Sequence, residues 1–399
     1  MSLSNGRSYL AIPGPSVMPD RVLRAMHRAA PNIYAGELVE ITETIVRDLK
    51  VVAGTQHHAA IYIANGHGVW EAALRNLLGA GDKVLVPSVG RFGEGWAEMA
   101  KSIGAEVELM PFPHLEPMDM ERIKTRLEAD KDHQIKAVLI THVDTSSSIK
   151  TDPRALRDVL DACDHPALLG VDCIASLGCD RFEMDAMGVD MMIAASQKGM
   201  MVPPGVGFVF FNDRAAAVRD RLTYVSGYWD WKPRANPEAF YQYFGGTAPT
   251  HHLYGLREAL DMLLEEGMEA VWHRHEVLAR AIWAAVDAWG EAGPMALNIK
   301  DPAHRSCAVT AAHIGAPAGA ELRAWLEEKA GVTLGIGLGM STEEDPKGEG
   351  FFRFGHMGHL NAHMVLGMLG TVEAGMIALG IPHGAGGLSA AARVVAEGA

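Results

Sequence analysis

The sequence predicts an α/β protein whose larger domain is built on a mostly parallel, seven-stranded sheet flanked by helices. Seven short apolar runs are hydrophobic on both faces, as are strands buried inside such a sheet. The predicted strands are 60–64, 83–86, 105–109, 137–141, 167–171, 191–195 and 206–211. Segments with helical periodicity separate most of these runs, and this alternation is typical of parallel sheets. The predicted helices are 68–79, 93–103, 119–129 and 153–163.

The C-terminal part of the chain predicts a smaller, second α/β domain. Residues 226–250 combine Pro, Gly, Trp and Tyr without a helix or strand pattern, so a long loop is expected there. One long helix over 252–288 then links the domains. The predicted strands of the small domain are 304–313, 332–335 and 351–355. The 399 residues are expected to divide into an N-terminal segment 1–20, a large domain 21–270 and a small domain 271–399.

The composition argues against several classes of protein. The net charge is −14 and no run of Lys or Arg is present, so nucleic acid is not an expected partner. The first residues hold no signal-peptide core, and no apolar stretch is expected to reach the roughly 18 residues of a membrane span. The four cysteines form no CxxC pair or disulfide pattern, which fits a reducing compartment. A cytoplasmic protein without membrane association is therefore expected.

Lys198 and Asp172 are the first candidates for chemistry, because ligands bind at the carboxyl ends of strands in such sheets. Lys198 comes directly after strand 191–195 and shortly before a rigid Pro-Pro-Gly turn, although a solvated surface lysine is the alternative. Asp172 ends the preceding strand, where a buried carboxylate needs a partner. The protonated ring nitrogen of pyridoxal phosphate (PLP) is such a partner. A helix cap or a metal ligand is the alternative role for Asp172.

A Gly-rich turn is the candidate cradle for a phosphate group. The turn consists of Asn65, Gly66, His67 and Gly68. It follows strand 60–64 and opens the next helix, where backbone N–H groups bind phosphate and glycines permit its close approach. The side chain of His67 is not required for this contact. Gln197 beside the candidate lysine and Thr247 in the long loop are further candidates for phosphate binding.

Two more residues are candidates for contact with the cofactor ring. Phe92 lies just past strand 83–86, where an aromatic side chain can stack on a pyridine ring; a core phenylalanine is the alternative. Thr145 follows strand 137–141, and its hydroxyl can reach the ring oxygen of the cofactor.

Arg353 is the candidate for binding a substrate carboxylate. It is a lone arginine in the apolar strand 351–355, and a buried guanidinium group needs a partner. Its planar fork grips a carboxylate at two points, which fits an amino-acid substrate, while a buried salt bridge is the alternative. The nearby His356, His359 and His363 lack the Cys or acid pattern that completes a zinc site, so no metal is expected.

These residues, in this order, resemble the class V (fold type I) PLP-dependent aminotransferases, and most closely the alanine–, serine– and aspartate–glyoxylate group. The similarity runs from PGP at 13–15 to RFGHMG at 353–358. Its most specific segments are VDCIASLG at 171–178 and GVDMMIAASQKGMMVPPG at 188–205. The resemblance implies PLP fold type I, pyridoxal 5'-phosphate as the cofactor and transamination as the reaction.

The resemblance also implies roles for individual residues. Lys198 would form the Schiff base with PLP, and Asp172 would pair with the ring nitrogen. Arg353 would hold the substrate carboxylate, with Gly14 and Tyr34 as further substrate-binding residues. The implied cofactor-binding residues are Gly66, His67, Gly68, Phe92, Thr145, Gln197 and Thr247. Since Thr247 would reach the phosphate of the partner subunit, a homodimer with shared active sites is expected.

Three positions depart from the pattern of many relatives. Tyr-Ala-Gly at 34–36 replaces Asp-His-Arg, Ser-Ser at 147–148 replaces Ser/Thr-Gly, and Phe244 replaces a tyrosine. These positions surround the expected substrate and phosphate. They therefore bear on the choice of substrate and leave the chemistry itself unchanged.

The expected function is transamination of a small L-amino acid (serine, alanine or aspartate) with a small 2-oxo acid, glyoxylate or pyruvate. A cysteine desulfurase-type lyase is one alternative, but it needs a nucleophilic cysteine on a mobile loop, which segment 335–352 lacks. A pyridoxamine–pyruvate-type transaminase is another, and it works on the free vitamin without a phosphate site. A catalytically inactive binding protein on the same scaffold is the third.

Overall fold

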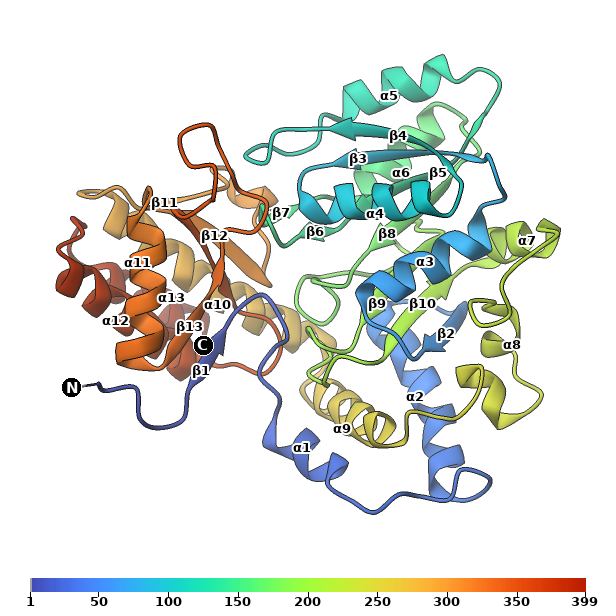
Figure 1. The fold of residues 1–399 in the computed structure, drawn as a ribbon, viewed down its shortest axis with the longest axis horizontal. Helices are drawn as coiled ribbons and strands as arrows, with labels where there is room; N and C mark the ends of the chain where they lie inside the picture. Colours follow the sequence, from blue (N-terminus) through green and yellow to red (C-terminus); the bar gives the residue numbers. More distant parts are fainter. Residues whose placement is uncertain (1) are drawn as a thin grey trace.

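The computed structural model describes residues 2–399 and contains two main sheets, each with its own helices (Figure 1). The larger sheet has seven strands in the order β2-β10-β9-β8-β5-β3-β4. Its strands are β2 (His58–Tyr62), β3 (Lys83–Ser88), β4 (Glu106–Pro111), β5 (Ile135–Thr141), β8 (Leu168–Asp172), β9 (Met191–Ala195) and β10 (Gly207–Phe211). Within it, β10 runs antiparallel to both neighbours and the other pairs are parallel. The predicted seven-stranded, mostly parallel sheet is confirmed.

Alternate residues of the large sheet face two different hydrophobic cores. In β5, Ala137 and Leu139 pack in the core under α3 and α4, whereas Val138 and Ile140 pack in the core under α2, α5, α6 and α9. Successive strand residues point to opposite faces, so a strand covered on both faces is apolar throughout. The helices around this sheet are α2 (Glu37–Ala53), α3 (Gly66–Leu77), α4 (Arg91–Ser102), α5 (Met120–Ala129), α6 (Pro153–Ala162), α7 (Asp213–Arg221) and α9 (Thr250–Glu266).

The smaller sheet has five strands in the order β1-β13-β14-β12-β11. Its strands are β1 (Tyr9–Ala11), β11 (Ala296–Leu297), β12 (Val309–His313), β13 (Val332–Ile336) and β14 (Phe351–Gly355). It packs with α10 (Met268–Gly290), α11 (Ala318–Trp325), α12 (Ala362–Leu379) and α13 (Gly387–Gly398) around a third core. The N-terminal segment thus supplies an edge strand to the small sheet. The remaining elements are α1 (Asp20–Met26), the hairpin β6 (Val143–Asp144) and β7 (Ile149–Lys150), and short helical turns at Pro302–His304 and Leu326–Ala330.

The connection between the two sheets differs from the predicted single helix over 252–288. Gly267 separates α9 from α10 and has φ +84°, a conformation that glycine adopts without a steric penalty. The first turns of α10 pack in the large core through Val271, and its later turns pack in the small core through Leu278. A domain boundary at 270 stays a prediction and lies in the first turn of α10.

The long loop predicted over 226–250 contains two short helical segments. They are α8 (Lys232–Ala235) and a 3₁₀ helix at Phe240–Phe244. Phe244 is fully buried in the large core, so the aromatic residues of this segment anchor it to the domain. An irregular sequence pattern therefore conceals an ordered, packed connection.

The expectation that no apolar stretch reaches membrane-spanning length is wrong for α12. This helix has 18 residues and a mean hydropathy of 1.5, so by length and composition it is apolar enough to cross a membrane. One face packs in the core of the small domain through Val365 and Leu369. Exposed positions of α12 also carry small or apolar residues, such as Ala374 and Ile377. The composition of this helix therefore resembles that of a membrane span.

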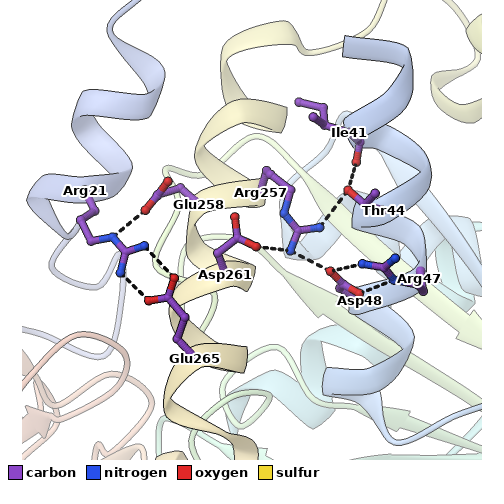
Figure 2. A network of polar contacts seen from close by, with 9 residues as sticks. All are labelled: Arg21, Ile41, Thr44, Arg47, Asp48, Arg257, Glu258, Asp261 and Glu265. Carbon is purple, nitrogen blue, oxygen red and sulfur yellow. Dashed lines mark hydrogen bonds and ion pairs between the residues drawn. The ribbon is translucent and has the colours of Figure 1, made fainter. Parts of the chain in front are cut away.

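A network of charged groups joins α2 to α9 (Figure 2). Arg257 of α9 contacts Asp48 of α2 at 2.8 Å and Asp261 at 2.9 Å, and it donates a hydrogen bond to Thr44. Asp48 is only 4% exposed. Burial by itself raises the pKa of Asp48, but hydrogen bonds from Arg47 and Arg257 outweigh it and hold this pKa below its usual value. The pairing thus keeps a buried carboxylate ionised.

Replacing Arg257 with Leu should destabilise the fold by about 3 kcal/mol, because it leaves a buried carboxylate with one guanidinium partner instead of two. Urea unfolding of the full chain measures this change. Arg21→Leu is the matched control, since Arg21 joins α1 to α9 through Glu258 and Glu265 but its side chain is 43% exposed (Figure 2). Equal losses of unfolding free energy in the two variants would contradict the claim that the buried pair stabilises the fold more than the exposed one.

Candidate active site

Seven of the predicted site residues line one cavity of about 210 Å³. These residues are Gly66, His67, Phe92, Thr145, Asp172, Gln197 and Lys198. They come from five segments of the chain. Each segment lies at, or shortly after, the carboxyl end of a strand of the large sheet. The carboxyl ends of parallel strands meet at one edge of a sheet, which is why residues far apart in the chain share this cavity.

The start of α3 forms one wall of the cavity. Asn65 caps the helix, and its side-chain oxygen accepts a hydrogen bond from the N–H of Gly68 at 3.2 Å. Gly68 is not among the residues that line the cavity and its N–H is directed to the cap, so its role in cofactor binding stays a prediction. Gly66 and His67 lie on the wall at the positive end of the helix dipole. Across the same cavity, the amide oxygen of Gln197 is buried without a hydrogen-bond partner among residues 2–399.

Asp172 is a buried carboxylate at the end of β8, with 4% of its surface exposed. One oxygen accepts a hydrogen bond from the N–H of Ile174 at 2.8 Å, and the other accepts one from the indole of Trp70 at 2.7 Å. Burial raises the pKa of Asp172 to about 6, while both hydrogen bonds and the charge of Lys198 act in the opposite direction. Within the part of the chain that the structure describes, Asp172 forms no ion pair.

Lys198 reaches the cavity from the turn after β9. Its amine donates a hydrogen bond to the carbonyl of Pro13. Burial, the largest effect, and the positive charge of Arg353 together lower the pKa of Lys198 to about 8, although the charge of Asp172 opposes both. Gly14 lies against the end of this side chain, since a Cβ there would be 2.4 Å from Nζ. Glycine at 14 therefore leaves the space that the lysine amine occupies.

Arg353 reaches toward the large domain from β14, which lies between β12 and β13. Its Nε donates to the carbonyl of Ile336 at 2.7 Å, and its Nη1 donates to the carbonyl of Thr145 at 2.9 Å. The residue is 6% exposed, and burial lowers the pKa of Arg353 to about 10. Among residues 2–399, no carboxylate lies within 4.0 Å of the guanidinium group, so the alternative of a buried salt bridge is wrong.

Sequence reasoning missed two buried residues of this region, Asp144 and Trp70. One oxygen of Asp144 accepts hydrogen bonds from the backbone N–H groups of Phe92 and Gly93 at 2.9 and 3.1 Å. Its other oxygen accepts from the N–H and hydroxyl of Ser146. Asp144 thus fixes the start of α4, where Phe92 stands. The sequence held one signal for each residue, which was its position beside a predicted site residue. Asp144 directly precedes Thr145, and Trp70 follows His67 by three residues.

Tyr34 and Thr247 do not line the cavity of their own chain. Tyr34 is 88% exposed in the connection between α1 and α2, and Thr247 is exposed just before α9. The two connections are adjacent, because the imidazole of His251 hydrogen-bonds the carbonyl of Arg28 at 3.0 Å. Both residues therefore lie on one region of the surface.

The other departures from the resemblance lie in the backbone and the core. Ser148 has φ +62°, the left-handed conformation that explains the glycine at this position in many relatives. Phe244 is fully buried among other aromatic side chains. Neither side chain lines the cavity of its own chain.

Comparison with known proteins agrees with this geometry. The family model "Aminotransferase class-V" matches residues 9–351. The chain belongs to the class V aminotransferases. The serine–glyoxylate aminotransferase of Methylorubrum extorquens is 37% identical, over 98% of this chain and 97% of its own length. The L-aspartate–glyoxylate aminotransferase of Paracoccus denitrificans is 34% identical over 96% and 94%. The structure of ureidoglycine–glyoxylate aminotransferase from Bacillus subtilis matches with a TM-score of 0.85 at 26% identity, over 99% of both chains.

The cysteines of this aminotransferase do not favour lyase chemistry. In the part of the chain that the structure describes, no cysteine lines the cavity. Burial raises the pKa of all four thiols, which disfavours the reactive thiolate. Cys307 lies before β12 rather than on a strand as predicted.

The imidazole of His356 contacts Thr310 and the carbonyl of Cys307. Residues 2–399 contain no group of three or more His, Cys, Asp or Glu side chains suited to a metal ion.

Asp172→Asn should remove a pH-dependent loss of stability from the cofactor-free aminotransferase. The pKa of Asp172 is about 6 in the folded chain, against an ordinary value of 3.8 for an aspartate in water, so the folded state binds more protons between these values. Wild-type stability therefore falls as the pH rises through this window. Relative to wild type, the free energy of unfolding of the variant should increase by about 3 kcal/mol over the same window. Urea unfolding at several pH values measures this difference, and a difference independent of pH would contradict the buried charge.

Proposed function

We propose that this aminotransferase uses PLP to transfer the amino group of a small L-amino acid (serine, alanine or aspartate) to a small 2-oxo acid, glyoxylate or pyruvate. The observation that carries the proposal is the convergence of Lys198 and Asp172 on one small cavity, with Arg353 beside it. The relatives named for serine–glyoxylate and aspartate–glyoxylate transamination support this choice of substrates.

The residues around the cavity fit PLP. Asp172 is a buried carboxylate without an ion pair among residues 2–399, which suits a protonated ring nitrogen. Gln197 offers a buried polar atom that lacks a partner. Gly66 and His67 at the start of α3 would hold the phosphate, Phe92 would contact the ring and Thr145 would face its oxygen. Lys198 would hold the cofactor covalently.

The side chains supply binding and proton transfer. PLP, when bound, supplies an electron sink next to the α-carbon of the amino acid. Lys198 would accept the α-proton and deliver it to the cofactor, because its lowered pKa of about 8 makes the neutral amine more accessible near physiological pH. Arg353 binds the substrate carboxylate and so orients the α-carbon toward Lys198. Asp172 keeps a proton on the ring nitrogen.

The space and charge around the cavity agree with a small substrate. A short amino-acid side chain suits a cavity of about 210 Å³ that also holds the cofactor. The cationic groups near it are Lys198, which the chemistry uses, and Arg353, which takes the substrate carboxylate. Serine and alanine meet these limits without a further charged partner, and aspartate meets them with a cation from a second subunit.

We also propose a cytoplasmic homodimer with shared active sites. The surface region that carries Tyr34 and Thr247 lies outside the cavity of its own chain, and both side chains are exposed. A second subunit covering this region would place Thr247 near the phosphate of its partner. The four free cysteines agree with a reducing compartment.

Lys198→Ala should abolish both transamination and the visible absorbance band that PLP gives when bound to a lysine amine, because no other lysine lines the cavity among the described residues. Absorbance spectra of the purified protein with added PLP measure this, before and after addition of L-serine and then glyoxylate. Lys150→Ala is the control, since Lys150 lies outside the cavity, and it should keep the band. A coloured, active Lys198→Ala protein would disprove the assignment.

Arg353→Lys should raise the KM for the amino acid by about 100-fold while the protein keeps its colour, because a point charge cannot grip a carboxylate at two positions. Steady-state kinetics with serine and glyoxylate measure this effect. Arg305→Lys, outside the cavity, serves as the control. An unchanged KM in the Arg353 variant would show that another residue binds the carboxylate.

A further inference from the structure

Trp70 connects three of the residues proposed to contact the cofactor. It lies in α3, lines the cavity and is 2% exposed. Its indole N–H donates a hydrogen bond to Asp172 at 2.7 Å. Its ring system meets the ring of His67 edge-on with 4.7 Å between centroids, and that of Phe92 with 6.4 Å. One side chain thus contacts the acid and two neighbouring parts of the cavity wall.

The hydrogen bond from Trp70 has a direct effect on the charge of Asp172. A donor directed at a carboxylate favours its ionised form. The second donor to Asp172 is the backbone N–H of Ile174, which no side-chain substitution removes. Trp70 is therefore the side chain that opposes the burial of this acid through a hydrogen bond, while Lys198 opposes it through its charge.

Several charged groups face Asp172 from the surrounding elements. Asp144 of the hairpin β6–β7 raises the pKa of Asp172, and Lys198 after β9 lowers it. The buried thiol of Cys173 follows Asp172 in the chain, and His67 faces Trp70 from α3. None of these side chains is within hydrogen-bond distance of the carboxylate among the described residues, so Trp70 is its direct side-chain partner.

We propose that Trp70 is a positioning residue that keeps the carboxylate of Asp172 ionised and oriented in the cavity, and thereby increases the affinity of the site for PLP. The part that concerns PLP rests on the proposed function. The part that concerns Asp172 does not, because the hydrogen bond exists in the protein chain alone.

Trp96 provides a matched control for this hydrogen bond. It stacks on Trp70 at 6.5 Å with an interplanar angle of 15° and is fully buried in the same core. Its indole N–H has no hydrogen-bond partner among residues 2–399. Trp70→Phe and Trp96→Phe therefore remove similar volumes from one aromatic cluster, but only the first removes a donor to Asp172.

The first experiment measures the pKa of Asp172 in the full chain without PLP. Each Trp variant is unfolded in urea across a pH series, alone and combined with Asp172→Asn, and the difference isolates the titration of Asp172. Trp70→Phe should move the midpoint upward by about one pH unit, because a hydrogen bond to a charged group is lost. Trp96→Phe should leave it in place. Equal midpoints in Trp70→Phe and wild type would overturn the proposal.

The second experiment measures the dissociation constant of PLP by fluorescence titration of the same proteins. At a pH below both midpoints, Trp70→Phe should bind PLP about 10-fold more weakly than Trp96→Phe, because a midpoint about one pH unit higher lowers the ionised fraction of Asp172 about 10-fold. Equal affinities would overturn the role in cofactor binding. Failure of the wild-type protein to bind PLP would instead overturn the proposed function, while the pH series would still decide the role of Trp70 toward Asp172.

A third measurement covers the case in which Trp70→Phe does not fold. Wild-type protein labelled with ¹⁵N in its tryptophan side chains contains eight indole N–H groups. One indole resonance should titrate with the pKa of Asp172, and this titration should vanish in Asp172→Asn. A wild-type spectrum in which no indole resonance titrates in this way would overturn the proposal.

Discussion

The burial of one carboxylate, Asp172, is the constraint on which the site depends. An ionised acid at the end of a strand is costly in a medium of low dielectric constant. The chain offsets this cost with the backbone N–H of Ile174 and the indole of Trp70, and it places no ion pair there within the described residues. A ligand that brings a positive charge pairs with Asp172 when its carboxylate is ionised and correctly oriented, and these two donors favour that form.

A comparison within the same domain shows that this arrangement is specific to the site. Asp48 is as deeply buried as Asp172, but the guanidinium groups of Arg47 and Arg257 pair with it (Figure 2). The pairing holds the pKa of Asp48 below its usual value, whereas the pKa of Asp172 is raised. The fold therefore gives cationic partners to Asp48, which joins two helices. It gives no cationic partner to Asp172 in the cavity within the described residues.

The site also depends on contact between the two sheets. Arg353 belongs to the small sheet, yet its guanidinium group donates to the carbonyl of Thr145, which lies beyond a strand of the large sheet. Its carbonyl contacts orient the fork and leave it without a carboxylate partner among residues 2–399. The side chain of Arg353 therefore links the small sheet to the loop that follows β5 of the large sheet.

The strands of the large sheet could be predicted because burial on both faces imposes a local pattern, seen in β5 as alternating contacts with two cores. Lys198 and Asp172 could be predicted as site residues because the end of a strand can be located in the sequence, and ligands bind at the carboxyl ends of such strands. The break at Gly267 was hidden within a continuous helical pattern. The length and composition of α12 resemble those of a membrane span, and only the tertiary structure shows that one of its faces packs in the core of the small sheet and its helices.

The sequence by itself determined the class of fold and the family, and it indicated the residues proposed to carry the chemistry, because each depends on residue types within short segments. The tertiary structure decided which partners those residues have. Trp70 and Asp172 are 102 positions apart, and Arg353 and Thr145 are 208 apart. Burial and hydrogen-bond partners together set the pKa of a charged group, and both are decided by the packing of distant segments, which no local pattern records.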